Sequence, residues 1–247
     1  MHTKSAHGGV QHRTIDDDYV DFTEADARNS YEQSRQQFGD SLFAMRIHDA
    51  NHARNDGKGL AADGPVDDVT MALSDSGMVG GGLVSLRAEG KISEISMGMM
   101  TGGRDGPHES LPDALRLFRE AAPGTFDSAL LACGWNLLTQ DSLPAFVECE
   151  QRDVKVHNAG ILASGLLAGG VTYVYGDATD AQREGAAQWG ELAARYTLSL
   201  PAVAVAFGAC RSCLSRNNFA LHKSPVELNE HLPARVQHGC RTAWTRW

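Results

Sequence analysis

Short runs of apolar residues alternate along the chain with longer stretches of helical periodicity. The runs that predict strands fall at residues 42–47, 92–97, 126–132, 154–158 and 218–221. Each is followed by a segment that predicts a helix, at residues 67–89, 109–121, 142–152, 179–196 and from 223 onward. This alternation is typical of βαβ units and predicts an α/β fold with a parallel sheet. It fits a (β/α)-barrel and a doubly wound sheet equally well.

Local signals mark several helix ends. Thr23 followed by Asp26 matches a capping box that opens a helix over residues 24–38. The predicted helix 67–89 contains three consecutive glycines, 80–82, each of which costs about 1 kcal/mol relative to alanine. Gly90 ends that helix.

Two more helices are predicted towards the end of the alternating region. The helix over 179–196 carries Trp189, Leu192 and Ala193 on its apolar side. The apolar segment 200–208 predicts another helix with proline in its first turn.

The strand 154–158 runs directly into a loop of small residues. Gly160, Ala163, Ser164 and Gly165 leave the backbone of this loop nearly bare. Bare N–H groups can approach an anion closely, and α/β sheets hold ligands at the carboxyl ends of their strands. The loop lacks a Gly-Lys-Ser/Thr ending and is therefore not a nucleotide-triphosphatase P-loop. From composition alone, a tight turn without a ligand is the simpler interpretation.

Composition narrows the class of protein. The 247 residues, 42% of them hydrophobic, are enough for one sizeable core, and the net charge of −9 argues against nucleic acid or an anionic membrane as the partner. No apolar run reaches the roughly 20 residues that span a bilayer. Five scattered cysteines favour reduced thiols and a cytoplasmic location. We expect a disordered lead-in over 1–20, one domain over 21–233 and a tail over 234–247.

Four segments resemble a known family. Over residues 42–49, 90–98, 126–138 and 158–167 the chain is similar, in the same order, to the aldo-keto reductases, and most of all to their aldose 1-dehydrogenase members. The resemblance covers roughly residues 20–232. It implies a partial TIM barrel that contains strands 4–8 and binds NAD(P)H at the carboxyl ends of its strands.

The resemblance also implies roles for single residues. His48 would be the active-site histidine, and Trp135 would stack on the nicotinamide. The loop around the pyrophosphate would be formed by Ala159, Ser164, Gly165 and Leu166. Lys223 and Ser224 would grip the 2′-phosphate of NADP, with Glu227 near the adenine. A lysine beside that phosphate favours NADP over NAD.

Three departures from the family pattern stand out. Met99, Met100 or Thr101 replaces an amide residue that binds the carboxamide, and the last strand, 216–221, is unusually polar. The first three barrel strands, with the catalytic Asp, Tyr and Lys, have no counterpart, since each βα unit needs about 30 residues. Neither Tyr19 nor Tyr31 is a convincing substitute for the missing acid. The fourth and eighth strands would be open edges, through which the chain could self-associate.

Two functions follow from this pattern. The first is an oxidoreductase that moves hydride between NADP(H), with NAD as the alternative, and a small sugar or aldehyde, without a metal. The second is an inactive relic or cofactor-binding module. The loop with Tyr173 and Tyr175 is either a belt across the cofactor or an ordinary surface loop. We interpret the cysteine pair at 210 and 213, and the cluster of His222, His231, His238 and Cys240, as residues without a metal.

Overall fold

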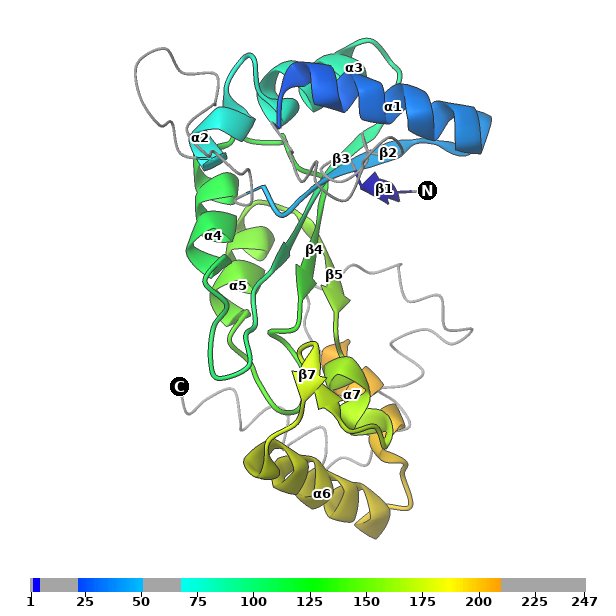
Figure 1. Ribbon diagram of the computed structural model, residues 1–247, viewed down its shortest axis with the longest axis vertical. Helices are drawn as coiled ribbons and strands as arrows, with labels where there is room; N and C mark the ends of the chain where they lie inside the picture. Colours follow the sequence, from blue (N-terminus) through cyan, green and yellow to red (C-terminus); the bar gives the residue numbers. More distant parts are fainter. Residues whose placement is uncertain (1, 5–21, 51–67, 210–247) are drawn as a thin grey trace. The chain divides into compact units, whose positions relative to one another are not determined.

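The computed structural model describes residues 2–4, 22–50 and 68–209 (Figure 1). Its contacts divide the chain into two units. Unit 1 comprises residues 1–100, 110–130 and 151–154. Unit 2 comprises residues 101–109, 131–150 and 155–247. The boundaries expected at 20 and 233 lie outside the described residues and stay a prediction.

The sheet begins in unit 1. It contains β1 (His2–Lys4), β2 (Ala44–His48), β3 (Glu94–Met100) and the first residues of β4 (Ser128–Ala132), in that order. β1 pairs with β2 and β2 pairs with β3 in parallel, and the second pairing sets His48 opposite Gly98. The strands predicted at 42–47, 92–97 and 126–132 are therefore confirmed, with ends shifted by up to three residues.

Nothing in the apolar pattern predicts β1. The open edge expected at β2 was wrong, because residues 2–4 pair along that edge. The register sets the backbone of Lys4 opposite Arg46.

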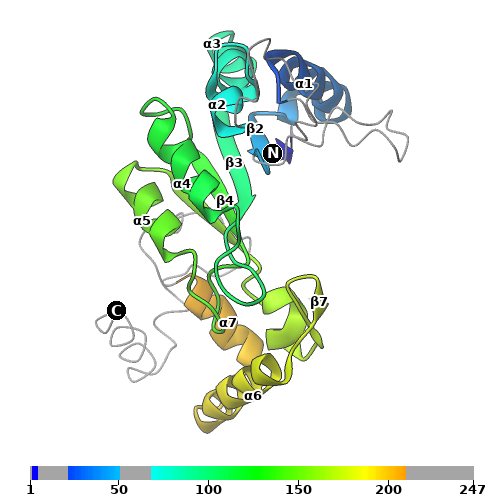
Figure 2. The same ribbon diagram turned by 60° about the vertical axis from the view of Figure 1, so that its left-hand side comes forward.

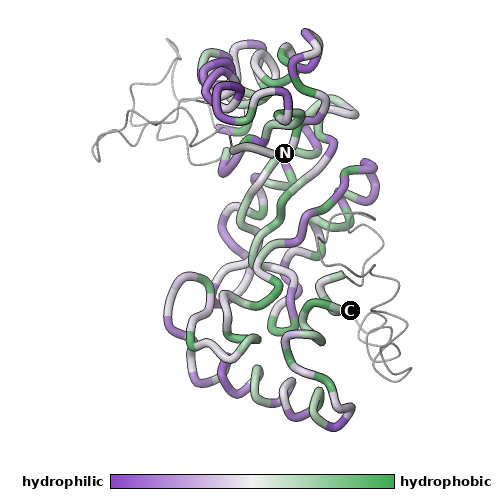
Figure 3. The backbone as a smooth tube through the Cα atoms, turned by 90° about the vertical axis from the view of Figure 1, so that its right-hand side faces the viewer, coloured by the Kyte–Doolittle hydropathy of each residue, from purple (hydrophilic) through white to green (hydrophobic). Residues whose placement is uncertain are grey.

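The predicted first helix is confirmed. α1 (Glu24–Phe38) begins at the expected capping box, in which Thr23 and Asp26 exchange hydrogen bonds. It is hydrophilic over most of its length, whereas β3 is mostly apolar (Figure 3). The residues that α1 buries are Ala27, Ser30 and Tyr31, at the i, i+3, i+4 spacing of a helix face.

The single helix predicted over 67–89 was wrong. The chain forms α2 (Asp68–Leu73), a π-helix η2 (Met78–Leu83) and α3 (Val84–Ala88) instead. The glycines allow η2 to pack closely against α1, and this packing takes the place of one continuous helix. A methyl group on Gly82 would lie 2.4 Å from the Cβ of Ala27. Gly90, with φ +72°, ends α3 as predicted.

We expect Gly82→Ala to destabilise unit 1 by about 1–3 kcal/mol, because the added methyl must displace α1. Urea unfolding followed by circular dichroism measures the change. Gly190→Ala is the control for the added methyl alone, since the atom nearest to its Cβ position is Cδ2 of Leu200 at 3.9 Å. A Gly82→Ala variant as stable as the wild type would contradict this packing.

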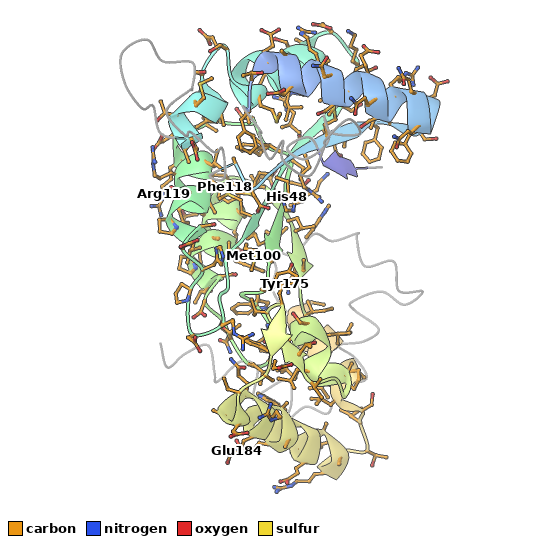
Figure 4. The ribbon with its side chains drawn as sticks, in the orientation of Figure 1. His48, Met100, Phe118, Arg119, Tyr175 and Glu184 are labelled. Atoms are coloured by element: carbon orange, nitrogen blue, oxygen red, sulfur yellow. The ribbon has the colours of Figure 1, made fainter. Side chains whose placement is uncertain are left out.

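α4 (Leu111–Glu120) follows β3 in unit 1. Its buried residues, Leu111, Ala114, Leu117 and Phe118, form one stripe. Phe118 meets Phe126 edge to face at 6.1 Å, while Arg119 points to solvent (Figure 4). The helix predicted at 109–121 is thus confirmed, and its apolar face builds the core.

Unit 2 holds the end of β4 and the elements that follow. These are α5 (Leu143–Gln151), whose last residue belongs to unit 1, β5 (Lys155–Ala159), the 3-10 helix η3 (Ala163–Ala168), the hairpin β6 (Thr172–Tyr173) and β7 (Gly176–Asp177), α6 (Asp180–Arg195) and α7 (Leu200–Gly208). α6 and α7 lie side by side (Figures 1 and 2). The predicted helices at 142–152, 179–196 and 200–208 are confirmed.

The apolar side expected for α6 was partly wrong. Ala186 and Ala193 are buried, but Leu192 is 38% exposed. The small residues Ala186 and Ala193 allow α6 to lie close to its neighbours, and the larger Leu192 stays at the edge of this contact. No helix within the described ranges is both long and apolar enough to cross a membrane.

Candidate functional site

In unit 1, the sheet places His48 at the carboxyl end of β2 (Figure 4). Its Nδ1 lies 2.6 Å from Oδ2 of Asp49. Asp49 has φ +50°, and its N–H donates to the carbonyl of Gly98 at 2.8 Å. The carboxylate therefore holds one ring nitrogen and fixes the orientation of the imidazole.

Gly98 leaves room for the side chains beside it. A methyl group there would lie 3.0 Å from Cδ2 of His48 and 2.9 Å from Cδ of Arg46. Arg46 donates from Nε to Oγ of Ser96 at 2.9 Å, and Ser128 donates to the same oxygen at 3.0 Å. Burial lowers the pKa of the Arg46 guanidinium. One face of the sheet is therefore polar and buried, with His48 at its end.

In unit 2, the loops after β3 and β4 touch backbone to backbone. A methyl group on Gly102 would lie 2.3 Å from Cα of Gly134. The N–H groups of Thr101 and Gly102 both donate to the carbonyl of Ala132, and the hydroxyls of Thr101 and Ser142 are hydrogen-bonded. Two glycines thus fix the loops at the carboxyl ends of the strands.

The residues that replace the amide side chain expected to bind the carboxamide are mostly enclosed. Met99 and Thr101 are buried, and Met100, at the end of β3, is half-buried (Figure 4). Neither methionine can donate a hydrogen bond to a carboxamide, and the hydroxyl of Thr101 is already engaged.

Trp135 is 1% exposed and packs among aromatic rings. Its ring stacks on Phe207 with centroids 5.5 Å apart and planes 17° apart, and Phe146 lies at 5.3 Å. Stacking on a nicotinamide would therefore require Phe207 to move. That role stays a prediction.

The loop after β5 adopts a left-handed backbone. Ala163, Ser164 and Gly165 all have positive φ. The N–H of Gly165 donates to Leu162, and its carbonyl accepts from Gly170, both at 2.9 Å. Because this N–H is already engaged, an anion would have to use others in the loop.

The other predicted loop residues are placed as follows. Ala159 ends β5, and its carbonyl accepts from the N–H of Cys133 at 2.9 Å. The carbonyl of Ser164 accepts from the hydroxyl of Thr172, and the Leu166 side chain is buried. The structure brings Ala159, Ser164, Gly165 and Leu166 into one segment of unit 2.

The sequence argument did not single out Asn158. Its Nδ2 donates to the carbonyls of Trp135 at 3.0 Å and Gly208 at 3.4 Å. Its Oδ1 is enclosed and has no hydrogen-bond partner among the described residues. The signal available in the sequence was an amide side chain at the end of a predicted strand. An enclosed acceptor without a donor costs about 1–3 kcal/mol, so an amide at such a position indicates a ligand.

Three predicted cofactor residues, Lys223, Ser224 and Glu227, lie outside the described residues, as do the last predicted strand and both groups of cysteines and histidines. Within residues 2–4, 22–50 and 68–209, no group of three or more His, Cys, Asp or Glu side chains is arranged to hold a metal ion.

Comparisons with known proteins rest on structure alone. No family model and no curated protein matches the chain. The chain is similar to the glycerol dehydrogenase AKR11B4 from Gluconobacter oxydans, with 15% identity, a TM-score of 0.55 and coverage of 95% of this chain and 69% of that one. It is also similar to the holo form of the aldo-keto reductase AKR11C1 from Bacillus halodurans, with 14% identity, a TM-score of 0.52 and coverage of 98% and 70%.

A third match, PA4992 from Pseudomonas aeruginosa, is 21% identical and covers 60% of this chain and 46% of its own, with a TM-score of 0.39 that carries no weight. The chain thus spans between 46% and 70% of the lengths of these proteins. The structural neighbours are aldo-keto reductases, and the chain has a partial α/β fold of the TIM-barrel type.

Proposed function

We propose that the protein is a nicotinamide-dependent oxidoreductase of the aldo-keto reductase type. It moves hydride between NADP(H) and the carbonyl or anomeric carbon of a small sugar or aldehyde. The observation that carries this proposal is His48, held by Asp49 at the carboxyl end of β2 in a fold whose structural neighbours are aldo-keto reductases. The nicotinamide supplies the redox chemistry, and the chain binds and orients the reactants.

His48 suits a carbonyl or hydroxyl ligand. An imidazole whose one nitrogen is held by a carboxylate presents its ring in a fixed direction. The half-buried setting, with side-chain exposures of 14% for His48 and 20% for Asp49, strengthens hydrogen bonds by lowering the local dielectric.

The fit to a nicotinamide cofactor is partial. The enclosed Oδ1 of Asn158 could accept a hydrogen bond from an N–H donor such as a carboxamide. Binding would then offset the free-energy cost of a buried acceptor without a hydrogen bond. Because the atom is enclosed and Phe207 covers Trp135, a ligand reaches either residue only if α7 gives way. We therefore derive no reaction step through the cofactor.

The alternative is an inactive relic that retains part of the cofactor site. The position of Tyr31 favours this alternative, because it argues against Tyr31 as a substitute for the missing catalytic acid. It is buried in unit 1, and the ammonium of Lys91 lies 5.6 Å from its ring centre, so its role is packing. Tyr19 lies outside the described residues.

Titration of the purified chain with NADPH, followed by quenching of tryptophan fluorescence, tests the proposal. The oxidation of L-fucose and D-arabinose is then assayed. Binding with turnover supports the oxidoreductase, and binding without turnover supports the relic. Absence of binding would contradict both.

Lys223 is proposed to select the phosphorylated cofactor. We expect Lys223→Ala to weaken NADPH binding by about tenfold and to leave NADH binding unchanged, because a charge-assisted hydrogen bond contributes about 1.5–3 kcal/mol in full and less when exposed. Fluorescence titrations with each nucleotide measure the two affinities. Equal losses for both would show that the lysine does not meet the 2′-phosphate.

A further inference from the structure

Tyr173 ends strand β6 of the hairpin in unit 2 and is 3% exposed. Tyr175, in the turn of the same hairpin, is 83% exposed (Figure 4). The turn places Val174 and Tyr175 at positive φ, 41° and 61°. This conformation is costly for a β-branched residue, so the surrounding structure must impose it. One effect is to send Tyr173 inward and Tyr175 outward.

Arg104 fastens the hairpin to the loop after β3. Its guanidinium donates to the carbonyl of Tyr173 at 2.7 Å and to that of Asp177. Gly176 leaves room for the guanidinium, since a methyl group at this position would lie only 2.3 Å from Nη1 of Arg104. The carbonyl of Arg104 accepts from Nε2 of Gln182 at 2.9 Å. Arg104 therefore holds the backbone of Tyr173, and Gln182 in turn holds the backbone of Arg104.

Within the described ranges, the hydroxyl of Tyr173 makes no hydrogen bond to another residue. Arg104 contacts Tyr173 at its backbone carbonyl and not at its hydroxyl. The hydroxyl oxygen is not among the enclosed polar atoms without a partner in the described residues, so solvent and a small ligand can reach it although the ring is buried. A phenol that is fixed in place and lacks a partner is suited to a ligand.

The charges around the phenol restrict that ligand. Burial raises the pKa of Tyr173 most, the carboxylates of Asp141 and Asp105 and the thiol group of Cys133 raise it further, and Arg104 lowers it. The phenol therefore stays neutral and able to donate. The two carboxylates, Asp141 and Asp105, act against an anion and outnumber the one cation, Arg104, and their oxygens can accept hydrogen bonds from hydroxyl groups.

We propose that the Tyr173 hydroxyl donates a hydrogen bond to an oxygen of a neutral polyhydroxylated or carbonyl ligand, such as a sugar, a polyol or an aldehyde, bound beside Asp105 and Asp141. The proposal deepens the proposed function by assigning a residue for its substrate. Binding of such a ligand at Tyr173 does not itself require the nicotinamide.

Fluorine NMR of the full chain labelled with 3-fluorotyrosine tests this inference. The chain has five tyrosines, and the signal of Tyr173 is identified by its loss in Tyr173→Phe. The probes are glycerol, DL-glyceraldehyde and L-fucose, each added without and with NADPH, and gluconate is the anionic comparison. Tyr175→Phe is the matched control on the same hairpin.

We expect at least one neutral probe to shift the Tyr173 signal while gluconate does not. We expect Tyr173→Phe to weaken that probe by about five- to tenfold, as loss of one hydrogen bond does, and Tyr175→Phe to leave it unchanged. A Tyr173 signal that no neutral probe moves, or equal affinity in Tyr173→Phe, would overturn the inference. A Tyr173 shift in a chain whose tryptophan fluorescence does not respond to NADPH would support Tyr173 and count against the oxidoreductase, so the two failures are distinguishable.

Discussion

Replacing Gly102 by alanine is expected to destabilise unit 2 by about 3 kcal/mol, the upper end of the range for overpacking. The added methyl would lie 2.3 Å from Cα of Gly134 and 2.4 Å from the carbonyl oxygen of Cys133. Both are backbone atoms, and no rotation of a side chain relieves the conflict. The loops after β3 and β4 would have to separate.

Urea unfolding followed by circular dichroism gives the change in free energy. The matched control is Gly190→Ala in α6, where the nearest atom to an added methyl is Cδ2 of Leu200 at 3.9 Å. That substitution should be neutral or stabilise by about 0.5–1 kcal/mol, since alanine favours the helix. If Gly102→Ala proved as stable as Gly190→Ala, the close approach of the two loops would be wrong.

His48→Ala is expected to lower kcat for the proposed reaction by about 100-fold or more, since a positioned acid–base or orienting side chain contributes about that much. NADPH binding should be unchanged, because no contact with the cofactor is assigned to His48. Steady-state kinetics and fluorescence titration measure the two quantities.

Asp49→Asn separates orientation of the imidazole from its presence. An amide can still bond to Nδ1 but carries no charge, so kcat should fall less than in His48→Ala. Unchanged kcat in His48→Ala would remove this residue from the proposed chemistry.

Much of the fold could be predicted from the sequence because local signals and packing agree. The capping box at Thr23 and Asp26 and the stripe along α4 specify helices that the structure contains. The strands 92–97 and 154–158 are short segments with buried apolar residues such as Ile95, Met97 and Val156, and the structure contains both as β3 and β5.

The failures come from contacts between distant segments. The glycines in η2 suggested only a weaker helix, because Gly82 is required by Ala27, more than fifty residues away, and Gly80 and Gly81 by the backbone carbonyls of residues 73–75. β1 has no apolar pattern and exists through its pairing with β2. The turn at Val174 and Tyr175 lacks the usual Asn or Gly, so its shape depends on Arg104.

For the candidate site, position was more predictable than conformation. His48 stands at the end of its strand as the resemblance implied. The sequence could not show that the N–H of Gly165 is bonded within its own loop, or that Phe207 stacks on Trp135. Both depend on the path of the chain after β5.

Hydrogen exchange with and without NADPH, followed by mass spectrometry, shows whether a dinucleotide binds at the loop after β5. We expect slower exchange on NADPH binding over residues 158–170 and around Lys223, with no change in α1, which lies in unit 1. Slower exchange in α1 alone, or identical exchange everywhere at saturating NADPH, would contradict it.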